Sequence, residues 1–321
     1  MAEVSRNLKI GIIGAGGMVG RPHERWFREK QGRVRGEDLL CYDTDPASGY
    51  FDDINKADII FVCVPTPKNP DGSCNTSIVE SVVSKFENKI IVIKSTVPPG
   101  TTEDLQRKYP TNKFLFNPEF LTEAKAWEDF VNPIRQIIGY TDQSKDVALT
   151  VLNLLPQSYY QSPWSKDTYN FRFHTSTDAE LIKYYSNVFG ATVVAISNMF
   201  FDLSEALRNE GYNTNYERIR DGVSADTRVG GPAWKDVNHG SYRGFGGACF
   251  LKDLLAHIHT ISQRMKGGLS DARMSILVRG HHFFNALWSY NENLLNAQNL
   301  KVEDVLRHDK EIILNKKKPI E

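Results

Sequence analysis

The residue with the most reactive side chain in this sequence is a cysteine that lies among glycines. Cys249 belongs to the segment GFGGACFLKD, residues 244–253. The neighbouring glycines leave the thiol sterically open, and Lys252 favours its nucleophilic thiolate form. A thiolate can add to a carbonyl carbon and hold a substrate covalently. Without support from its surroundings, however, a single cysteine is better explained as a small buried apolar residue.

Two pairs of polar residues are spaced by four positions. Lys183 and Asn187 lie on one face of a helix if the segment around them is helical, so both can donate to one oxygen. The alternative is a solvated lysine and a surface asparagine. Glu119 and Glu123 form a second pair, and by spacing alone such a pair is typical of a hydrated helix surface.

A glycine-rich turn near the start of the chain predicts a dinucleotide site. After a short apolar run, Gly14 and Gly16 fit the GxGxxG pattern, but the third glycine is Gly20, one position late. Glycines let the backbone approach a pyrophosphate at the start of the next helix. Asp43 follows the second apolar run, where a carboxylate accepts both ribose hydroxyls and repels a 2′-phosphate. The pattern therefore favours NAD over NADP. The alternative is that Gly14–Gly20 is a glycine turn without a ligand and Asp43 an ordinary turn aspartate.

Five further segments occur in a specific order: PTPKNPDG (65–72), KSTVPPGTTE (94–103), NPEFLTEA (117–124), DAELIKYYSNVFGAT (178–192) and GFGGACFLKD (244–253). Together they resemble the UDP-glucose/GDP-mannose dehydrogenase family over about residues 8–295, and the wording is most similar to that of UDP-glucose 6-dehydrogenases. The resemblance implies NAD-dependent oxidation of a sugar CH2OH group to a carboxylate, through a thiohemiacetal and then a thioester.

The resemblance also assigns roles to individual residues. Cys249 is the nucleophile, Lys183 and Asn187 stabilise the oxyanion, and Glu119 is the general base for the water that opens the thioester. The remaining residues expected to take part in catalysis are Glu123, Thr96 and Asp253. The residues expected to bind the cofactor are Gly14, Gly16, Gly17, Met18, Val19, Asp43, Val64, Pro65, Thr66, Thr96 and Lys252. Those expected to bind the nucleotide sugar are Glu119, Phe120, Leu121, Lys183, Asn187, Arg228, Phe245, Gly246 and Gly247. Arg228 matches an arginine that reaches a neighbouring subunit's substrate, and an ordinary surface arginine is an equally good explanation.

These residues need a scaffold, and the apolar pattern predicts one. Short runs rich in Ile, Val and Phe alternate with amphipathic stretches at Leu8–Ile13, Leu39–Tyr42, Ile59–Val64, Ile90–Ile93, Phe114–Phe116 and Ile134–Ile138. Such runs are typical of buried parallel strands connected by helices. We therefore expect an α/β fold, with an N-terminal Rossmann-type doubly wound parallel sheet over residues 1–176.

The second part of the chain has a helical pattern. Asp178–Leu207 contains no proline and carries apolar residues at helical spacing, which predicts one long helix. Ser176 or Thr177 is a candidate N-cap, with Glu180 placed for a capping box. A glycine-rich stretch follows, and helical character resumes at Lys252. We expect an all-α substrate and dimerisation domain over residues 177–300, built on the long central helix, and a solvated tail over residues 301–321.

Composition excludes several functions. The 39 basic and 39 acidic residues give a formal charge of zero, so no strong field attracts nucleic acid or a membrane surface. The start of the chain has no apolar signal core, and the four cysteines and eight histidines form no metal-binding pattern. We expect a cytoplasmic enzyme, without a metal, that acts as a homodimer on a nucleotide sugar.

The sequence also departs from the family pattern. Ala57 follows Asp43 closely, without the usual intervening helix and loop, and Leu251 replaces a usual proline. Nothing in 301–321 resembles the family's second Rossmann-like domain, which holds the nucleotide, so we expect a short form. Two alternatives stay open: a β-hydroxyacid-type dehydrogenase with a single hydride transfer, and a non-catalytic fragment that needs a separate nucleotide-binding chain.

Overall fold

The computed structural model of the protein describes residues 8–158, 173–239, 241–306, 313 and 315–317. The segment Met1–Asn7 and the last four residues of the expected tail lie outside the described residues. The chain divides into two compact units. Unit 1 contains the residues up to Pro67 together with Asn75–Lys183, and unit 2 contains Lys68–Cys74 and the residues from Tyr184 onward.

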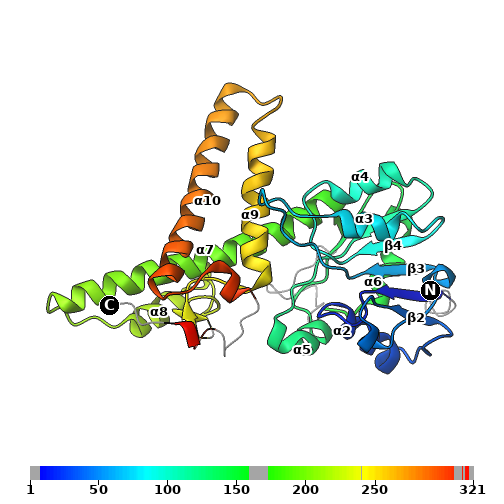
Figure 1. Ribbon diagram of the computed structural model, residues 1–321, viewed down its shortest axis with the longest axis horizontal. Coiled ribbons are helices and arrows are strands. Elements are labelled where there is room, and N and C mark those ends of the chain that lie inside the picture. The colour runs from blue at the N-terminus through cyan, green and yellow to red at the C-terminus, as the bar shows by residue number, and fades with distance from the viewer. Residues whose placement is uncertain (1–7, 159–172, 240, 307–312, 314, 318–321) are drawn as a thin grey trace. The chain divides into compact units, whose positions relative to one another are not determined.

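Unit 1 is built on a seven-stranded sheet with the order β2-β1-β3-β4-β5-β6-β7 (Figure 1). Its strands are β1 (Ile10–Ile13), β2 (Leu39–Tyr42), β3 (Ile59–Val62), β4 (Ile90–Ile93), β5 (Lys113–Phe116), β6 (Ile138–Tyr140) and β7 (Phe173–Thr175). The neighbouring strands from β2 to β5 are parallel. The strand order reverses at β1, and open sheets of this kind bind ligands at the carboxyl ends of the strands beside such a point.

Helices cover both faces of this sheet. They are α2 (Gly20–Arg25), which continues as a π-helical turn (Trp26–Lys30), α3 (Ser77–Val83), α4 (Thr101–Lys108), α5 (Ala126–Val131) and α6 (Ala148–Leu154). Because side chains alternate along a strand, Ile59 and Phe61 of β3 pack in the core that α6 covers. Ile60 and Val62 face the opposite core, which α3 and α4 cover. The doubly wound α/β architecture predicted from the sequence is confirmed.

The sixth strand differs from the prediction. The run Ile134–Ile138 predicts a parallel strand, but β6 begins only at Ile138 and pairs antiparallel with β5. Ile134 is exposed. A 3-10 turn (Glu123–Lys125) and α5 connect β5 to β6. A buried apolar run looks the same in either direction, so the local pattern does not distinguish a parallel from an antiparallel strand. The sheet is therefore mixed at this edge.

The predicted long helix is confirmed as α7 (Ser176–Asn209). The division between the two units falls within it, between Lys183 and Tyr184. Among the described helices, α7 alone is long and apolar enough to cross a bilayer by length and composition. A helix in the core of a globular domain meets the same criterion, and α7 carries buried polar residues, including Glu180.

The predicted capping box at the start of α7 is wrong. The Glu180 carboxylate instead accepts hydrogen bonds from the backbone N–H groups of Gly100 and Thr102, at 2.6 and 2.8 Å. These groups begin α4, where the N-cap Gly100 has no side chain that accepts a hydrogen bond. A backbone N–H group in the first turn of α7 has a different partner, because the Thr175 hydroxyl accepts a hydrogen bond from the Asp178 N–H at 3.2 Å.

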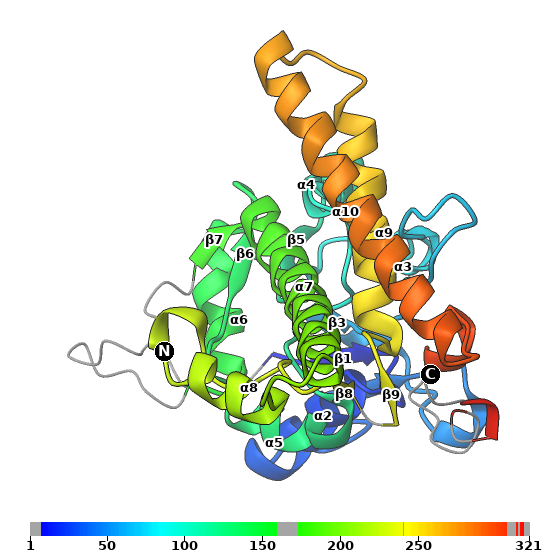
Figure 2. The same cartoon turned by 90° about the vertical axis from the view of Figure 1, so that its left-hand side faces the viewer.

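Unit 2 is mainly helical. Besides most of α7 it contains α8 (Tyr216–Ser224), α9 (Gly247–Arg264), α10 (Asp271–Ala297), the short strands β8 (Asn238–His239) and β9 (Tyr242–Arg243), and 3-10 turns at Thr227–Val229 and Val302–Val305. Figures 1 and 2 show α9 and α10 side by side as a hairpin. Val188 and Val194 of α7 share one apolar core with Leu254 of α9 and Leu295 of α10.

Two expectations for unit 2 are corrected. Helical structure resumes at Gly247 rather than at Lys252, so Cys249 lies in the first turn of α9. Gly247, the first residue of α9, has a positive φ of 72°, which glycine adopts without strain. The segment expected to be a tail from residue 301 packs in part against the helices, because Val305 and Ile313 are buried in the unit 2 core.

Candidate functional site

The glycine turn follows β1 and begins α2. Gly14 has a positive φ of 79°, and a Cβ atom there would lie 2.4 Å from the carbonyl oxygen of Cys63. A Cβ atom on Gly20 would lie 2.1 Å from the carbonyl oxygen of Gly14. The third glycine thus permits close packing of helix against turn, although it comes one position later than the usual pattern.

Asp43 is joined to this turn. Its carboxylate accepts the backbone N–H of Gly16 at 2.7 Å, and a Cβ atom on Gly16 would lie 3.0 Å from the same oxygen. Asp43 follows β2, so the chain brings a carboxylate to the glycine turn, as predicted. The backbone leaves no room for larger side chains at Gly14 and Gly16. The residues present therefore fit a dinucleotide: an open peptide turn for the pyrophosphate and a carboxylate for the ribose.

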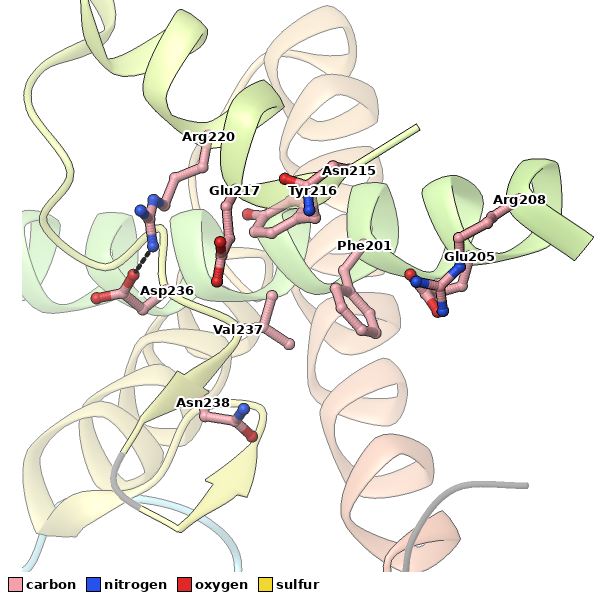
Figure 3. A pocket seen from close by; sticks show the side chains of 10 residues that line it. All are labelled: Phe201, Glu205, Arg208, Asn215, Tyr216, Glu217, Arg220, Asp236, Val237 and Asn238. Carbon is pink, nitrogen blue, oxygen red and sulfur yellow. Dashed lines mark hydrogen bonds and ion pairs between the residues drawn. The ribbon is translucent and has the colours of Figure 1, made fainter. Parts of the chain in front are cut away.

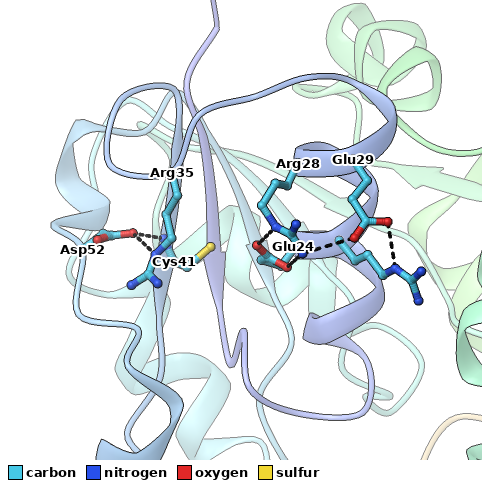
Figure 4. Close-up of polar contacts among 7 residues, drawn as sticks. Glu24, Arg28, Glu29, Arg35, Cys41 and Asp52 are labelled. Carbon is cyan, nitrogen blue, oxygen red and sulfur yellow. Dashed lines mark hydrogen bonds and ion pairs between the residues drawn. The ribbon is translucent and has the colours of Figure 1, made fainter.

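Ion pairs fix the strand and helix on either side of the turn (Figure 4). Asp52 accepts the backbone N–H of Cys41 in β2 at 2.8 Å and pairs with Arg35 at 3.3 Å. On α2 and its continuation, Arg28 pairs with Glu24 at 2.7 Å. These contacts lie beside the turn rather than in it, and only the Asp52 contact holds β2, which Asp43 follows.

The ends of β3 and β4 supply the next group of predicted cofactor residues. The Thr66 hydroxyl donates to the backbone carbonyl of Thr96 at 2.8 Å, and the Ser95 hydroxyl donates to that of Val64 at 2.6 Å. Val64, Thr66 and Thr96 are thus brought together, and Pro65 is exposed between Val64 and Thr66. Met18 and Val19, on the glycine turn, are also at least partly exposed.

Glu119 and Lys183 form a buried ion pair in unit 1. Their side chains are 6% and 4% exposed, and Lys183 Nζ lies 3.0 Å from Glu119 Oε1. Burial alone would raise the pKa of Glu119, but Lys183, the Leu121 N–H and Lys94 together hold that pKa below its ordinary value. Glu119 lies in the segment after β5 and not on a helix. Residue Glu123 begins the 3-10 turn there, and the position of its side chain lies outside the described part.

Phe120 lies next to this ion pair. The Arg135 guanidinium carbon is 3.9 Å from the centre of the Phe120 ring, and Lys183 Nζ is 5.4 Å from it. Cations above an aromatic ring are attracted by its negative face. The ring therefore adds a second favourable contact to the Lys183 ammonium besides the ion pair with Glu119.

Asp253 organises the corresponding polar group in unit 2. It is fully buried, and it accepts hydrogen bonds from the Asn187 amide and from the Lys252 ammonium. Burial alone lowers the pKa of Lys252, but Asp253 and the thiols of Cys74 and Cys249 raise it above its ordinary value. Asn187, Asp253, Lys252 and Cys249 are therefore brought together, as the sequence predicts.

Cys249 differs from the other cysteines. It is only partly buried, whereas Cys41, Cys63 and Cys74 are buried. Burial raises the pKa of both Cys41 and Cys63 to about 12, so these thiols stay protonated. Cys249 lies in the first turn of α9, where the N–H dipoles favour a negative charge, and Lys252 adds a cation.

The other predicted substrate residues have varied surroundings. Arg228 is exposed and pairs with Asp226 at 2.6 Å, which is compatible with either of its two interpretations. The Phe245 side chain is buried, and its N–H donates to Asn291 at 2.8 Å. A Cβ atom on Gly246 would lie 1.8 Å from the Tyr242 hydroxyl, so this position requires glycine before the first turn of α9.

A pocket lies elsewhere in unit 2 (Figure 3). It has a volume of about 500 Å³. Its lining residues are Phe201, Glu205, Arg208, Asn215, Tyr216, Glu217, Arg220, Asp236, Val237 and Asn238. None of them was predicted as a site residue, and Arg208 and Arg220 both pair with carboxylates. Among the residues that the structure describes, no group of three or more metal-ligating side chains is assembled.

Sequence reasoning missed two buried polar residues in unit 1. Lys94 follows β4, and Asn117 follows β5, where it begins the NPEFL segment. Lys94 Nζ donates to Asn117 Oδ1. A signal was present, because each residue is a polar side chain directly after a buried strand, where parallel sheets carry functional groups.

Comparisons with known proteins agree with this geometry. The model for the NAD binding domain of the UDP-glucose/GDP-mannose dehydrogenase family matches residues 46–154, and the model for the central domain of that family matches residues 177–273. The chain belongs to this family, and it binds NAD. The first match begins after the glycine turn and Asp43, so these two features support the cofactor independently.

Individual relatives carry related names. The chain is 34% identical over 216 residues to a UDP-glucose 6-dehydrogenase of Rickettsia typhi, and the aligned region covers 64% of this chain and 46% of the relative. It is 33% identical over 300 residues to a UDP-glucose 6-dehydrogenase of Rhizobium meliloti, and the aligned region covers 79% of this chain and 63% of the relative. A solved UDP-glucose dehydrogenase from the hyperthermophilic archaeon Pyrobaculum islandicum superposes with a TM-score of 0.71 at 25% identity, over 91% of this chain and 69% of that one. The chain spans about half the length of the Rickettsia relative.

Proposed function

We propose that this protein oxidises the C6 hydroxymethyl group of a nucleotide sugar to a carboxylate, with UDP-glucose as substrate and UDP-glucuronate as product. The observation that carries the proposal is the arrangement around Cys249. A partly exposed thiol in the first turn of α9 adjoins Lys252, which shares the buried Asp253 with Asn187. A single hydride transfer would need no such thiol.

NAD, held by the glycine turn and Asp43, supplies the hydride acceptor for each of the two oxidations. In the first oxidation the substrate CH2OH group loses its hydroxyl proton and a hydride and becomes an aldehyde. Lys183 and Asn187 lie one turn apart on α7 and donate to the substrate oxygen as negative charge develops there. Donors fixed in advance in this way contribute about 3 kcal/mol each to transition-state stabilisation.

In the second oxidation the Cys249 thiolate attacks the aldehyde carbon and forms a thiohemiacetal. Loss of a second hydride from that carbon gives a thioester. Water then adds to the thioester carbon, the carbon–sulfur bond breaks, and the thiolate leaves with the carboxylate as product. Glu119 is the base that takes the proton from this water, and Thr96 and Asp253 help to hold the water in place.

We further propose that the protein acts as a homodimer in the cytoplasm. Support comes from an apolar stripe on α7, which we define as Tyr185, Phe189, Ile196, Met199, Phe200 and Leu203, each at least 48% exposed. The spacing places these side chains along one side of the helix over several turns. A stripe of this size is typical of a protein interface.

The test is to count NADH produced per substrate consumed over a panel of UDP-glucose, GDP-mannose and UDP-N-acetyl sugars. We expect two NADH for each UDP-glucose. Cys249→Ala is expected to abolish the second oxidation, whereas Cys41→Ala, which removes a buried thiol in β2, is the control. No NADH from any sugar, with NAD binding intact, would count against the proposal.

The two alternatives give different results in the same assay. A β-hydroxyacid-type dehydrogenase would keep full turnover in Cys249→Ala and yield one NADH per substrate. A non-catalytic fragment would bind NAD but reduce it only after a separate nucleotide-binding chain was added. The arrangement of Cys249 with Lys252 and Asp253 favours the covalent route over both.

A further inference from the structure

The segment that leads into α9 is rich in glycine. It runs from Arg243 to Gly247, and Cys249 follows two residues later, in the first turn of the helix. Glycines leave a backbone many accessible conformations, so fixing a glycine-rich segment in one of them costs more entropy than fixing other residues. The position of the thiol therefore depends on contacts that hold this segment from outside.

Two amide side chains hold the segment along one edge. The Asn291 side chain, in α10, accepts the Phe245 N–H at 2.8 Å and donates to the Phe245 carbonyl at 3.0 Å. Gln298, which directly follows α10, accepts the Arg243 N–H at 2.8 Å and donates to the Arg243 carbonyl at 2.9 Å. Each amide thus makes both of the hydrogen bonds that a residue of a neighbouring antiparallel strand would make. Together they take the place of a strand beside the segment.

Both amides are buried, and α10 and the segment fit closely where they meet. Asn291 is 1% exposed and Gln298 is 0% exposed. Asn291 lies among the buried leucines of α10, such as Leu287 and Leu294, and a polar group in such a place is costly unless its hydrogen bonds are made. A Cβ atom on Gly244 would lie only 2.7 Å from Asn291 Oδ1, so the amide reaches the backbone because the intervening residue has no side chain.

The Arg243 side chain ties the start of the same segment to α7. Its guanidinium donates to Asn198 Oδ1 at 3.0 Å and pairs with Asp202 at 2.7 Å. The guanidinium carbon also lies 4.6 Å from the centre of the Phe201 ring. Arg243 is therefore held through its side chain by α7 and through its backbone by Gln298. All these residues belong to unit 2, which also contains the thiol.

We propose that Asn291 and Gln298 are positioning residues, which hold the segment before α9 so that Cys249 lies in a formed first turn. This inference rests on the proposed function for the reaction of Cys249, but not for the hydrogen bonds. The N–H groups of a first turn favour a thiolate only while that turn is formed. If the backbone is released at Phe245, the turn frays, because the glycines that follow have no side chain to hold it. The thiol is then less often ionised and less often in place to attack.

The direct test is the rate at which iodoacetamide alkylates Cys249 in the folded protein as a function of pH, with the modified peptide identified by mass spectrometry. Asn291→Ala removes the partner of the Phe245 N–H and carbonyl. We expect the pH midpoint of alkylation to rise by about one unit, a tenfold change in the ratio of thiolate to thiol. Asn285→Ala is the matched control, because Asn285 is an exposed asparagine of α10 whose amide donates to the His281 carbonyl. Equal midpoints in the two variants would overturn the proposal.

The buried cysteines distinguish a displaced thiol from a general loss of structure. Cys41, Cys63 and Cys74 are buried, and they should stay unmodified in Asn291→Ala. If that variant does not fold, and all the cysteines react, Gln298→Met takes its place, because methionine has a similar length but no amide. Gln298→Met should raise the midpoint at the nucleophile in the same direction, and an unchanged midpoint would again overturn the proposal.

Activity provides a second and separable measurement. In the proposed reaction the first oxidation needs no thiol, whereas the second proceeds through the thiohemiacetal. At saturating UDP-glucose, Asn291→Ala should therefore slow the second NADH by about tenfold, which corresponds to one or two ordinary hydrogen bonds, and leave the rate of the first nearly unchanged. Equal slowing of both steps would contradict a positioning role. If the protein makes no NADH, the proposed function fails, while the alkylation profile still decides whether Asn291 positions the thiol.

Discussion

Replacement of Asp253 by alanine tests the organisation of the thiol site most directly. Asp253 is fully buried and accepts hydrogen bonds from Lys252 and Asn187, so the change leaves two buried donors without their acceptor. Removal of one partner of a buried ion pair costs about 3–5 kcal/mol. Lys252 is 16% exposed, which places the expected loss near the lower end, at about 3 kcal/mol. The unsatisfied Asn187 amide adds about 1 kcal/mol or more.

The assay is urea unfolding followed by tryptophan fluorescence and by circular dichroism, at fixed NAD concentration because bound ligand stabilises the folded state. Asp253→Asn keeps one acceptor oxygen and should lose less stability than Asp253→Ala. Asp146→Ala is the matched control, because the Asp146 side chain is 63% exposed in its pair with Lys113. Such exposed pairs contribute little. Equal midpoints for Asp253→Ala and Asp146→Ala would refute the conclusion that Asp253 holds the two donors in place.

Three further predictions concern the scaffold. Burial raises the pKa of Glu180 to about 7, above its ordinary value of 4.5, so the folded state binds a proton more tightly than the unfolded state. The resulting stability is present below about pH 4.5 and is lost as the pH rises to 7. The free energy of unfolding should fall by up to about 3 kcal/mol over this range. Glu180→Gln should not show this fall when its unfolding is measured as a function of pH. Gly20→Ala should abolish NAD binding in calorimetry or prevent folding, because its Cβ would lie 2.1 Å from a backbone oxygen. Gly17→Ala is the control and should have a far smaller effect, because the nearest atom to a Cβ there is 3.3 Å away. Phe200→Glu, in the apolar stripe on α7, should convert the proposed dimer to a monomer in light scattering, and an unchanged mass would show that the stripe is not the interface.

The sequence predicts well those parts of the fold that local pattern controls. The run Ile59–Val64 is continuously apolar, and its first four residues form the interior strand β3. The unbroken helical spacing of Asp178–Leu207 likewise forms α7. By contrast, the antiparallel pairing of β6 with β5 leaves no mark on its apolar run, and the partner of Glu180 lies 78 residues away, at Thr102. Neither can be read from a local window.

The candidate site shows the same limit. Cys249, Lys183 and Asn187 were found because each lies in a specific motif, but the motifs do not reveal which carboxylate holds which donor. Lys94 was missed because a lysine after a strand has the same appearance whether it is solvated or buried. Its burial depends on Asn117, which is 23 residues away in sequence. Tertiary contacts between strand ends therefore determine which charged side chains are buried and which groups they pair with, and a local stretch of sequence does not show either.

The two donors on α7 are restrained by different carboxylates. Glu119 binds Lys183 within unit 1, and Asp253 binds Asn187 within unit 2. A lysine and an asparagine on consecutive helical turns would otherwise sample several rotamers, and ordering them during the reaction would cost free energy. Because both are already held by buried acceptors, that cost is met when the chain folds. If Lys183 and Asn187 stabilise the oxyanion as proposed, substitutions of Glu119 or Asp253 should weaken that stabilisation even where these carboxylates do not touch the substrate, and the two effects should arise in separate units.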